Sequence, residues 1–111
     1  MKIMDVGEVI ATRTLVLGQN DASHEEVSVL LGRPQQLPGH PDYYCPYQIR
    51  GAGADTLSYA CGIDSFQALL LALSTIEVEL GILKKQFGGE LRWDCGKQGA
   101  LGFPVMPPAS L

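Results

Sequence analysis

The sequence predicts an α+β fold in which one long helix packs on one face of an antiparallel sheet of about four to five strands. Several short runs rich in β-branched residues are separated by glycine, proline or polar residues. Only one long stretch has apolar residues at helical spacing. The predicted order along the chain is strand, strand, strand, strand, helix, strand.

The first two predicted strands form an antiparallel hairpin. Residues 9–17 (VIATRTLVL) are rich in β-branched side chains, and residues 26–31 (EVSVLL) alternate between apolar and other side chains. The polar cluster at residues 18–23 joins them, and so short a connection cannot make a parallel crossover.

A loop and two further strands follow. Residues 32–42 (GRPQQLPGHPD) contain three prolines and two glycines, which predicts a surface loop. Residues 43–50 (YYCPYQIR) predict a third strand, in which Pro46 cannot donate a hydrogen bond and is expected at a bulge or where its nitrogen faces no partner. A turn at 51–55 leads into a fourth strand at 56–61. The inward face of the third strand is expected to carry Cys45, Tyr47 and Ile49.

Residues 64–87 predict the helix. Asp64 is a suitable N-cap, and Gln67 follows three residues later, as in a capping box. The glycines at 88–89 end the helix, and residues 90–93 (ELRW) predict a short fifth strand. The residues expected to face the sheet are Phe66, Leu69, Leu70, Leu73, Ile76, Leu80, Leu83 and Phe87.

The composition indicates one folded domain. Of 111 residues, 46% are apolar and 18% are charged, which suits a single core. We expect the domain at residues 1–105 and a frayed tail at residues 106–111. Acidic residues outnumber basic residues by 12 to 8, which gives a net charge of −4. Because nucleic-acid backbones bind basic surfaces, we expect no nucleic-acid partner.

The cysteines and apolar runs bear on location. Cys45, Cys61 and Cys95 are odd in number and include no Cys-x-x-Cys pair, so neither a disulfide framework nor a zinc site is predicted. Residues 1–9 lack the apolar run of a signal peptide. The longest apolar stretch, 68–73, is shorter than the about 20 residues of a membrane span. We therefore expect a cytoplasmic protein that contacts no membrane.

Motifs for catalysis are missing from the sequence. It has no Walker motif, no His-Glu-x-x-His and no Gly-x-Ser-x-Gly, so the common NTPases and hydrolases are not predicted. Cys95 is the candidate reactive thiol, but no residue is assignable as its base. His24 and His40 are expected to be solvated. No catalytic residue, metal or cofactor is predicted, and a non-enzymatic role is favoured without excluding catalysis.

Arg13 is unusual because it lies in an otherwise apolar strand, on the same side as Leu15 and Leu17. One interpretation is that its stem covers the core while its guanidinium reaches water. The other pairs it with Glu77, which falls at the edge of the inward helix stripe. A structural role for Arg13 and Glu77, as an ion pair or as two solvated side chains, is favoured over catalysis.

The proline-rich loop is the candidate surface for binding a partner, through His40, Tyr43 and Tyr44. Long loops are often functional, and tyrosines make amphipathic contacts. A plain solvated connection explains the same residues equally well.

The outer face of the helix is the candidate dimer surface. Leu71, Val78 and Ile82 lie opposite the inward stripe, and a helix that is apolar on both faces is usually buried on both. Two such helices packed antiparallel about a two-fold axis would bury both rows, which predicts a homodimer. The alternative is that the segment at 101–105 folds back over the same row.

Five blocks of the sequence resemble a known family. They are residues 10–15 (IATRTL), 45–49 (CPYQI) with Gly51, 62–69 (GIDSFQAL), 91–93 (LRW) and 101–104 (LGFP). Together they resemble a family of small bacterial proteins known only as a domain of unknown function. The resemblance extends over residues 8–104 and implies a bacterial origin and a single domain. It implies no activity, cofactor or catalytic residue.

The function favoured by these features is that of a non-enzymatic module that binds another protein. One version is an immunity-like protein that blocks a basic toxin through an acidic face, because complementary charge speeds such encounters. The alternative is a small ligand-binding protein or enzyme whose pocket lies between the sheet and the C-terminal segment, near Arg13, Trp93 and Cys95.

Overall fold

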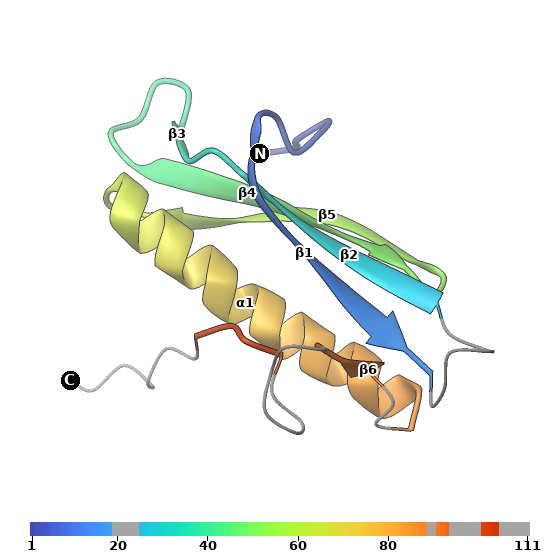
Figure 1. Ribbon diagram of the computed structural model, residues 1–111. Helices are drawn as coiled ribbons and strands as arrows, with labels where there is room; N and C mark the ends of the chain where they lie inside the picture. The colour runs from blue at the N-terminus through green and yellow to red at the C-terminus, as the bar shows by residue number, and fades with distance from the viewer. Residues whose placement is uncertain (19–24, 89–90, 94–100, 105–111) are drawn as a thin grey trace.

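The computed structural model describes residues 1–18, 25–88, 91–93 and 101–104. It has the predicted α+β fold, with an antiparallel sheet and one helix that follows most of the strands (Figure 1). The elements are β1 (Val9–Leu17), β2 (Glu25–Gly32), β3 (Gln35–Gln36), β4 (Tyr43–Gly51), β5 (Ala54–Gly62), α1 (Ser65–Gln86) and β6 (Leu91–Arg92).

The sheet is an antiparallel meander closed by a returning strand. β1 pairs with β2, β2 pairs with β4, and β4 pairs with β5 along its whole length. After β5 the chain passes through α1 to the opposite edge of the sheet, where β6 pairs with β1. The helix therefore crosses the sheet diagonally from the β5 edge to the β1 edge (Figure 1).

The loop expected at residues 32–42 is partly a strand, and that prediction is corrected. Gln35–Gln36 forms β3 and pairs with Tyr43–Tyr44 of β4. The registered pairing of β4 with β2 stops at Tyr47, so Pro46 lies in the interval between the two paired stretches. A residue without a backbone N–H is tolerated there, because the registered pairing on that side is interrupted. The structure shows no bulge at Pro46, whose pairing with Tyr59 of β5 continues in register.

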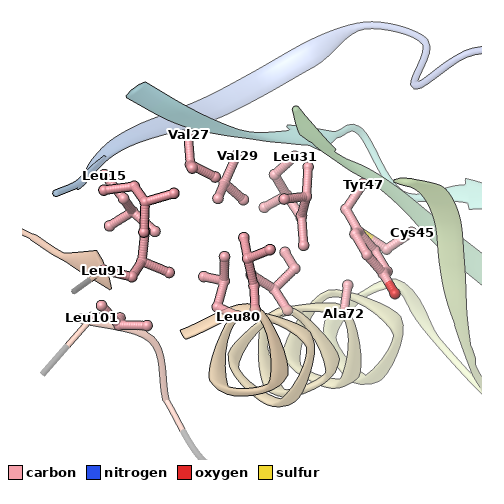
Figure 2. Packing of buried hydrophobic residues seen from close by; sticks show 14 of the residues in the cluster. Leu15, Val27, Val29, Leu31, Cys45, Tyr47, Ala72, Leu80, Leu91 and Leu101 are labelled. Carbon is pink, nitrogen blue, oxygen red and sulfur yellow. The ribbon is translucent and has the colours of Figure 1, made fainter. Parts of the chain in front are cut away.

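The core fills the layer between the sheet and α1 (Figure 2). Side chains from β1, β2 and β4 point toward the helix, including Cys45, Tyr47 and Ile49, as predicted. The helix packs chiefly beneath β4 and β5. Leu91 and Leu101, from β6 and the C-terminal segment, complete the core near Leu15 (Figure 2).

The helix begins and ends as predicted, but its N-terminal half presents a different face to the sheet. Asp64 accepts a hydrogen bond from the backbone N–H of Gln67 at 2.8 Å, which is the expected N-cap. Phe66, with 76% of its surface exposed, faces solvent, whereas Ala68 and Ala72 are fully buried. The inward stripe was therefore wrong for Phe66 and also for the exposed residues Leu70 and Phe87.

The alanines face the sheet because β5 offers only small side chains to them. Thr56, Ser58 and Ala60 lie directly opposite the inward residues of β4 and so share their face. Small residues on both sides allow the helix to approach the strand closely. Ala68 and Ala72 therefore face the sheet because they fit against β5, although larger apolar side chains lie nearby on the helix.

α1 is more apolar than its buried face requires. By length and composition alone it meets the requirements of a membrane span, with a mean hydropathy of 1.7 over its best window. The expectation based on residues 68–73 understated this, because it considered only an uninterrupted apolar run. Only 28% of that window is buried inside the fold, so much of its apolar surface remains uncovered.

Candidate functional site

Arg13 forms the centre of a small aromatic site between β1 and the C-terminal segment. Its guanidinium lies 3.8 Å from the centre of the Trp93 ring and 4.9 Å from that of Phe103. Its Nη1 donates a hydrogen bond to the carbonyl oxygen of Leu101 at 3.1 Å. Cation–π contacts and this bond hold a half-buried cation in a fixed position.

Gly102 makes this arrangement possible. Its φ of +83° is in the left-handed region, which side chains disfavour. A Cβ at this position would overlap the Nη1 atom of Arg13 and the ring of Trp93. Only glycine therefore lets the segment 101–104 pass so close to both side chains.

A groove of about 200 Å³ lies beside Arg13, between β1, β2, α1 and the C-terminal segment. Its walls are mostly aliphatic and aromatic, and Arg13 contributes the charged group. The groove is lined by Ala11, Thr12, Arg13, Val29, Leu31, Leu73, Ile76, Gly102, Phe103 and Pro104. This is the place where the sequence suggested a pocket, although Cys95 is outside the described residues.

Arg13 and Glu77 form no ion pair in the described part of the chain, so that alternative is corrected. The guanidinium instead contacts Trp93, Phe103 and the Leu101 carbonyl oxygen. One carboxylate oxygen of Glu77 is buried and has no hydrogen-bond partner among the described residues. The sequence contained a signal for the actual arrangement: the only tryptophan of the chain and an aromatic residue after a C-terminal glycine.

The three loop residues predicted to bind a partner do not share one surface. Tyr43 packs against the core. Tyr44, the next residue of the strand, makes an edge-to-face contact with Tyr59, with 5.9 Å between the two ring centroids. His40 accepts a hydrogen bond from the backbone N–H of Asp42 at 3.1 Å. Because successive strand residues point to opposite faces, Tyr43 and Tyr44 cannot act together.

The predicted dimer face is largely exposed. Val78 and Ile82 are 59% and 55% exposed, and Leu71 is half-buried. The C-terminal segment does not cover them through its described residues, because Leu101 is buried in the core and Phe103 packs on Arg13. Val105, the remaining residue of the alternative, lies outside the described residues.

The sequence analysis missed the polar neighbours of the buried Tyr47, which lies between β4 and α1. Tyr47 points from β4 into the layer above the helix (Figure 2). Burial raises its pKa to about 12, a hydrogen bond from the neighbouring Ser58 opposes the increase, and the charge of Glu79 adds to it. One carboxylate oxygen of Glu79 is buried without a hydrogen-bond partner in the described part of the chain. Strand alternation alone placed Tyr47 inside but could not indicate its polar neighbours.

Two cysteines are described, and both are free. Cys45 is buried, donates to the carbonyl oxygen of Gly32 at 3.4 Å, and has a pKa raised to about 11 by burial. Cys61 is exposed. Among the described residues no cluster of three potential metal ligands occurs. Cys95 and His24 lie outside the described residues, so the reactive-thiol prediction stays a prediction.

Comparisons with known proteins identify one family. No curated protein and no solved structure matches the chain significantly. A family described as "Domain of unknown function (DUF6968)" matches residues 11–105, and this stretch contains β1 to β6, apart from the first two residues of β1, and the whole groove. The chain therefore belongs to this family of domains of unknown function.

Proposed function

We propose that the protein is a non-enzymatic interaction module of the bacterial cytoplasm that associates with a second copy of itself through the outer face of α1. The observation that carries the proposal is the exposure of Val78 and Ile82, at 59% and 55%, on a helix of high hydropathy. A row of apolar side chains exposed on one helix is more than the scatter of single apolar residues found on ordinary surfaces.

Gly81 supplies a second, independent argument. It lies inside α1 about one helical turn after Val78, and a Cβ at this position would meet nothing within 4 Å. A glycine inside a helix costs about 1 kcal/mol relative to alanine, and the fold of a single chain gains nothing from it here. Close approach of another helix is a physical reason for a glycine on this face.

The helix dipoles favour an antiparallel pair. Asp64 caps the N-terminal end of α1, and Lys84 and Lys85 lie in its last turn. In an antiparallel arrangement the dipoles of the two helices oppose each other. Association of identical faces also closes after two copies, as in the commonest assemblies.

The double substitution Val78→Glu with Ile82→Lys tests the proposal. We expect the native protein to have the mass of a dimer at micromolar concentration and the variant to be a folded monomer, because charges would be buried in the interface. Light scattering measures the mass, and circular dichroism checks the fold. The matched control is Val9→Glu with Ile10→Lys, which charges two exposed apolar residues of β1 and should leave the dimer intact.

Gly81→Leu separates association from folding. Its side chain enters open space in a single chain and favours the helix, so the fold should keep its thermal stability. The same side chain would hold two helices apart and weaken the dimer. A native monomer, or a Gly81→Leu variant that dimerises like the native chain, would contradict the proposal.

The second candidate function is ligand binding. The observation that favours it is the groove beside Arg13, a concave and mostly apolar cavity with one charged group. It does not compete with self-association, because its lining lies on the side of α1 toward β1.

A further inference from the structure

We infer that the groove between β1 and α1 binds a small carboxylic acid, with its hydrocarbon part among the apolar side chains and its carboxylate on Arg13. The inference goes beyond the proposed self-association, since it concerns another surface and another kind of occupant. It rests on the size of the groove, the nature of its walls and the N–H donors of one cation that no described residue accepts.

The groove sets the size and character of the hydrocarbon part. Its volume is about 200 Å³. An aliphatic cavity of about 150 Å³ accommodates benzene, so a ring or a chain of about six to eight carbons fits this one. Val29 and Leu31 from the sheet and Leu73 and Ile76 from the helix provide apolar walls.

Arg13 determines the charge of the ligand. A guanidinium has five N–H donors, and Arg13 uses one of them for the carbonyl oxygen of Leu101. No other hydrogen bond or ion pair of Arg13 occurs within the described ranges. Trp93 and Phe103 hold the guanidinium in place, so a ligand would not have to order a flexible side chain.

A carboxylate matches these properties better than other groups. It accepts two parallel hydrogen bonds from the planar guanidinium and neutralises its single charge. An amine would meet a like charge at the same point. A phosphate dianion would bring a second charge against aliphatic walls, where an unpaired charge is costly.

Octanoate and 1-octanol are the probes that test the inference on the native protein. They share the hydrocarbon length and differ in the carboxylate. Trp93 is the only tryptophan of the chain and touches Arg13, so its fluorescence reports occupancy of the groove. We expect a saturable change with octanoate and binding of 1-octanol weaker by about tenfold or more, because a charge-assisted hydrogen bond is lost.

Three variants test which residues bind the carboxylate and which bind the hydrocarbon part. Their affinities are measured by calorimetry, because Arg13 contacts Trp93 and its substitution would change the fluorescence. Arg13→Met should lose about tenfold or more in affinity for octanoate while keeping its weak affinity for 1-octanol. Ala11→Leu narrows the groove and should weaken both probes. Arg50→Met, which removes an exposed arginine of β4, is the matched control and should change neither.

Three results would overturn the inference. They are equal affinity of the native protein for octanoate and 1-octanol, no saturable octanoate binding at millimolar concentration, and octanoate affinity unchanged in Ala11→Leu. The first and second use only the native chain, so they hold even if Arg13→Met does not fold. Neither depends on whether the protein dimerises.

Discussion

Tyr47 and Cys45 place two ionisable groups of β4 in the core, where water reaches neither of them. Both are almost completely buried, and burial raises the pKa of the Cys45 thiol to about 11 and that of Tyr47 to about 12. Desolvation disfavours the thiolate and the phenolate, so both groups keep their protons in the folded state. These two residues therefore make the stability of the fold depend on pH in the alkaline range.

The stability of the protein should therefore fall in alkali. The folded state holds these two protons more tightly than the unfolded chain, so the free energy of unfolding is fully retained below about pH 9 and decreases as pH rises toward about 12. Urea unfolding between about pH 8 and pH 11 measures the effect. Tyr47→Phe should reduce the slope, since one of the two groups is removed. A flat profile in the native protein would be incompatible with the burial of both groups.

Among the elements, the turn between β4 and β5 shows how backbone geometry limits sequence. Gly51 pairs with Ala54, which leaves Ala52 and Gly53 as the two turn residues. Both have positive φ, at 53° and 78°, as in the tight turns that suit twisted hairpins. The predicted turn is confirmed, and Ala52 is the only non-glycine residue with positive φ among the described residues.

Gly53→Ala should destabilise the protein by about 1 kcal/mol, because a side chain disfavours positive φ. Space is not the cause, since a Cβ at this position would meet nothing within 4 Å. Gly53→Asn is the matched control: it also fills open space, but asparagine tolerates this conformation, so its cost should be smaller. In thermal denaturation we expect the melting temperature to fall in the order native protein, Gly53→Asn, Gly53→Ala. Equal melting temperatures for the two variants would show that conformation does not decide the effect.

At the scale of the whole molecule, the C-terminal segment belongs to the core. Leu101 is buried beside Leu15 and Leu91, and the segment 101–104 runs back along α1 (Figure 1). Leu101→Ala should cost about 2–4 kcal/mol in the free energy of unfolding, as for other buried leucines. Phe66→Ala, on the exposed end of α1, should cost well under 1 kcal/mol. Urea unfolding compares the two, and a cost for Leu101→Ala no larger than for Phe66→Ala would mean that the segment does not close the core.

Most of the fold followed from local signals in the sequence. The bounds of β1 and α1, the hairpin of β1 and β2 and the Asp64 cap all arise within a few residues of chain, so periodicity and turn chemistry predicted them. β3 was missed because two glutamines among prolines carry no strand pattern. Its pairing with β4 depends on tertiary contacts instead.

The site was harder to predict because it joins residues distant in sequence. Arg13 was recognised as unusual, but its partners Trp93 and Phe103 come from segments about eighty to ninety residues away. The pairing with Glu77, suggested by charge and by its place at the edge of the helix stripe, does not occur among the described residues, where the guanidinium contacts Trp93 and Phe103. An aromatic residue that stacks on an arginine carries no charge, so its pairing with the arginine cannot be predicted from complementary charges in the sequence.

The inward stripe of α1 was right for Ile76, Leu80 and Leu83. It was wrong near the N-terminal end, at Phe66 and Leu70, since the small side chains of β5 decide which helix face approaches them.

The chain order of the sheet and helix has a consequence for synthesis on the ribosome. Strands β1 to β5 are complete at Gly62, before any residue of α1 has been made. During translation the five strands therefore leave the ribosome before α1 does. The apolar face of the sheet stays uncovered until the helix packs on it. Pairing of β6 with β1 comes later still, because Leu91 must return to Leu17. A nascent chain that stalls after β5 has left the ribosome, while α1 is still inside the exit tunnel, would present Val27, Val29 and Tyr47 to chaperones or to other nascent chains.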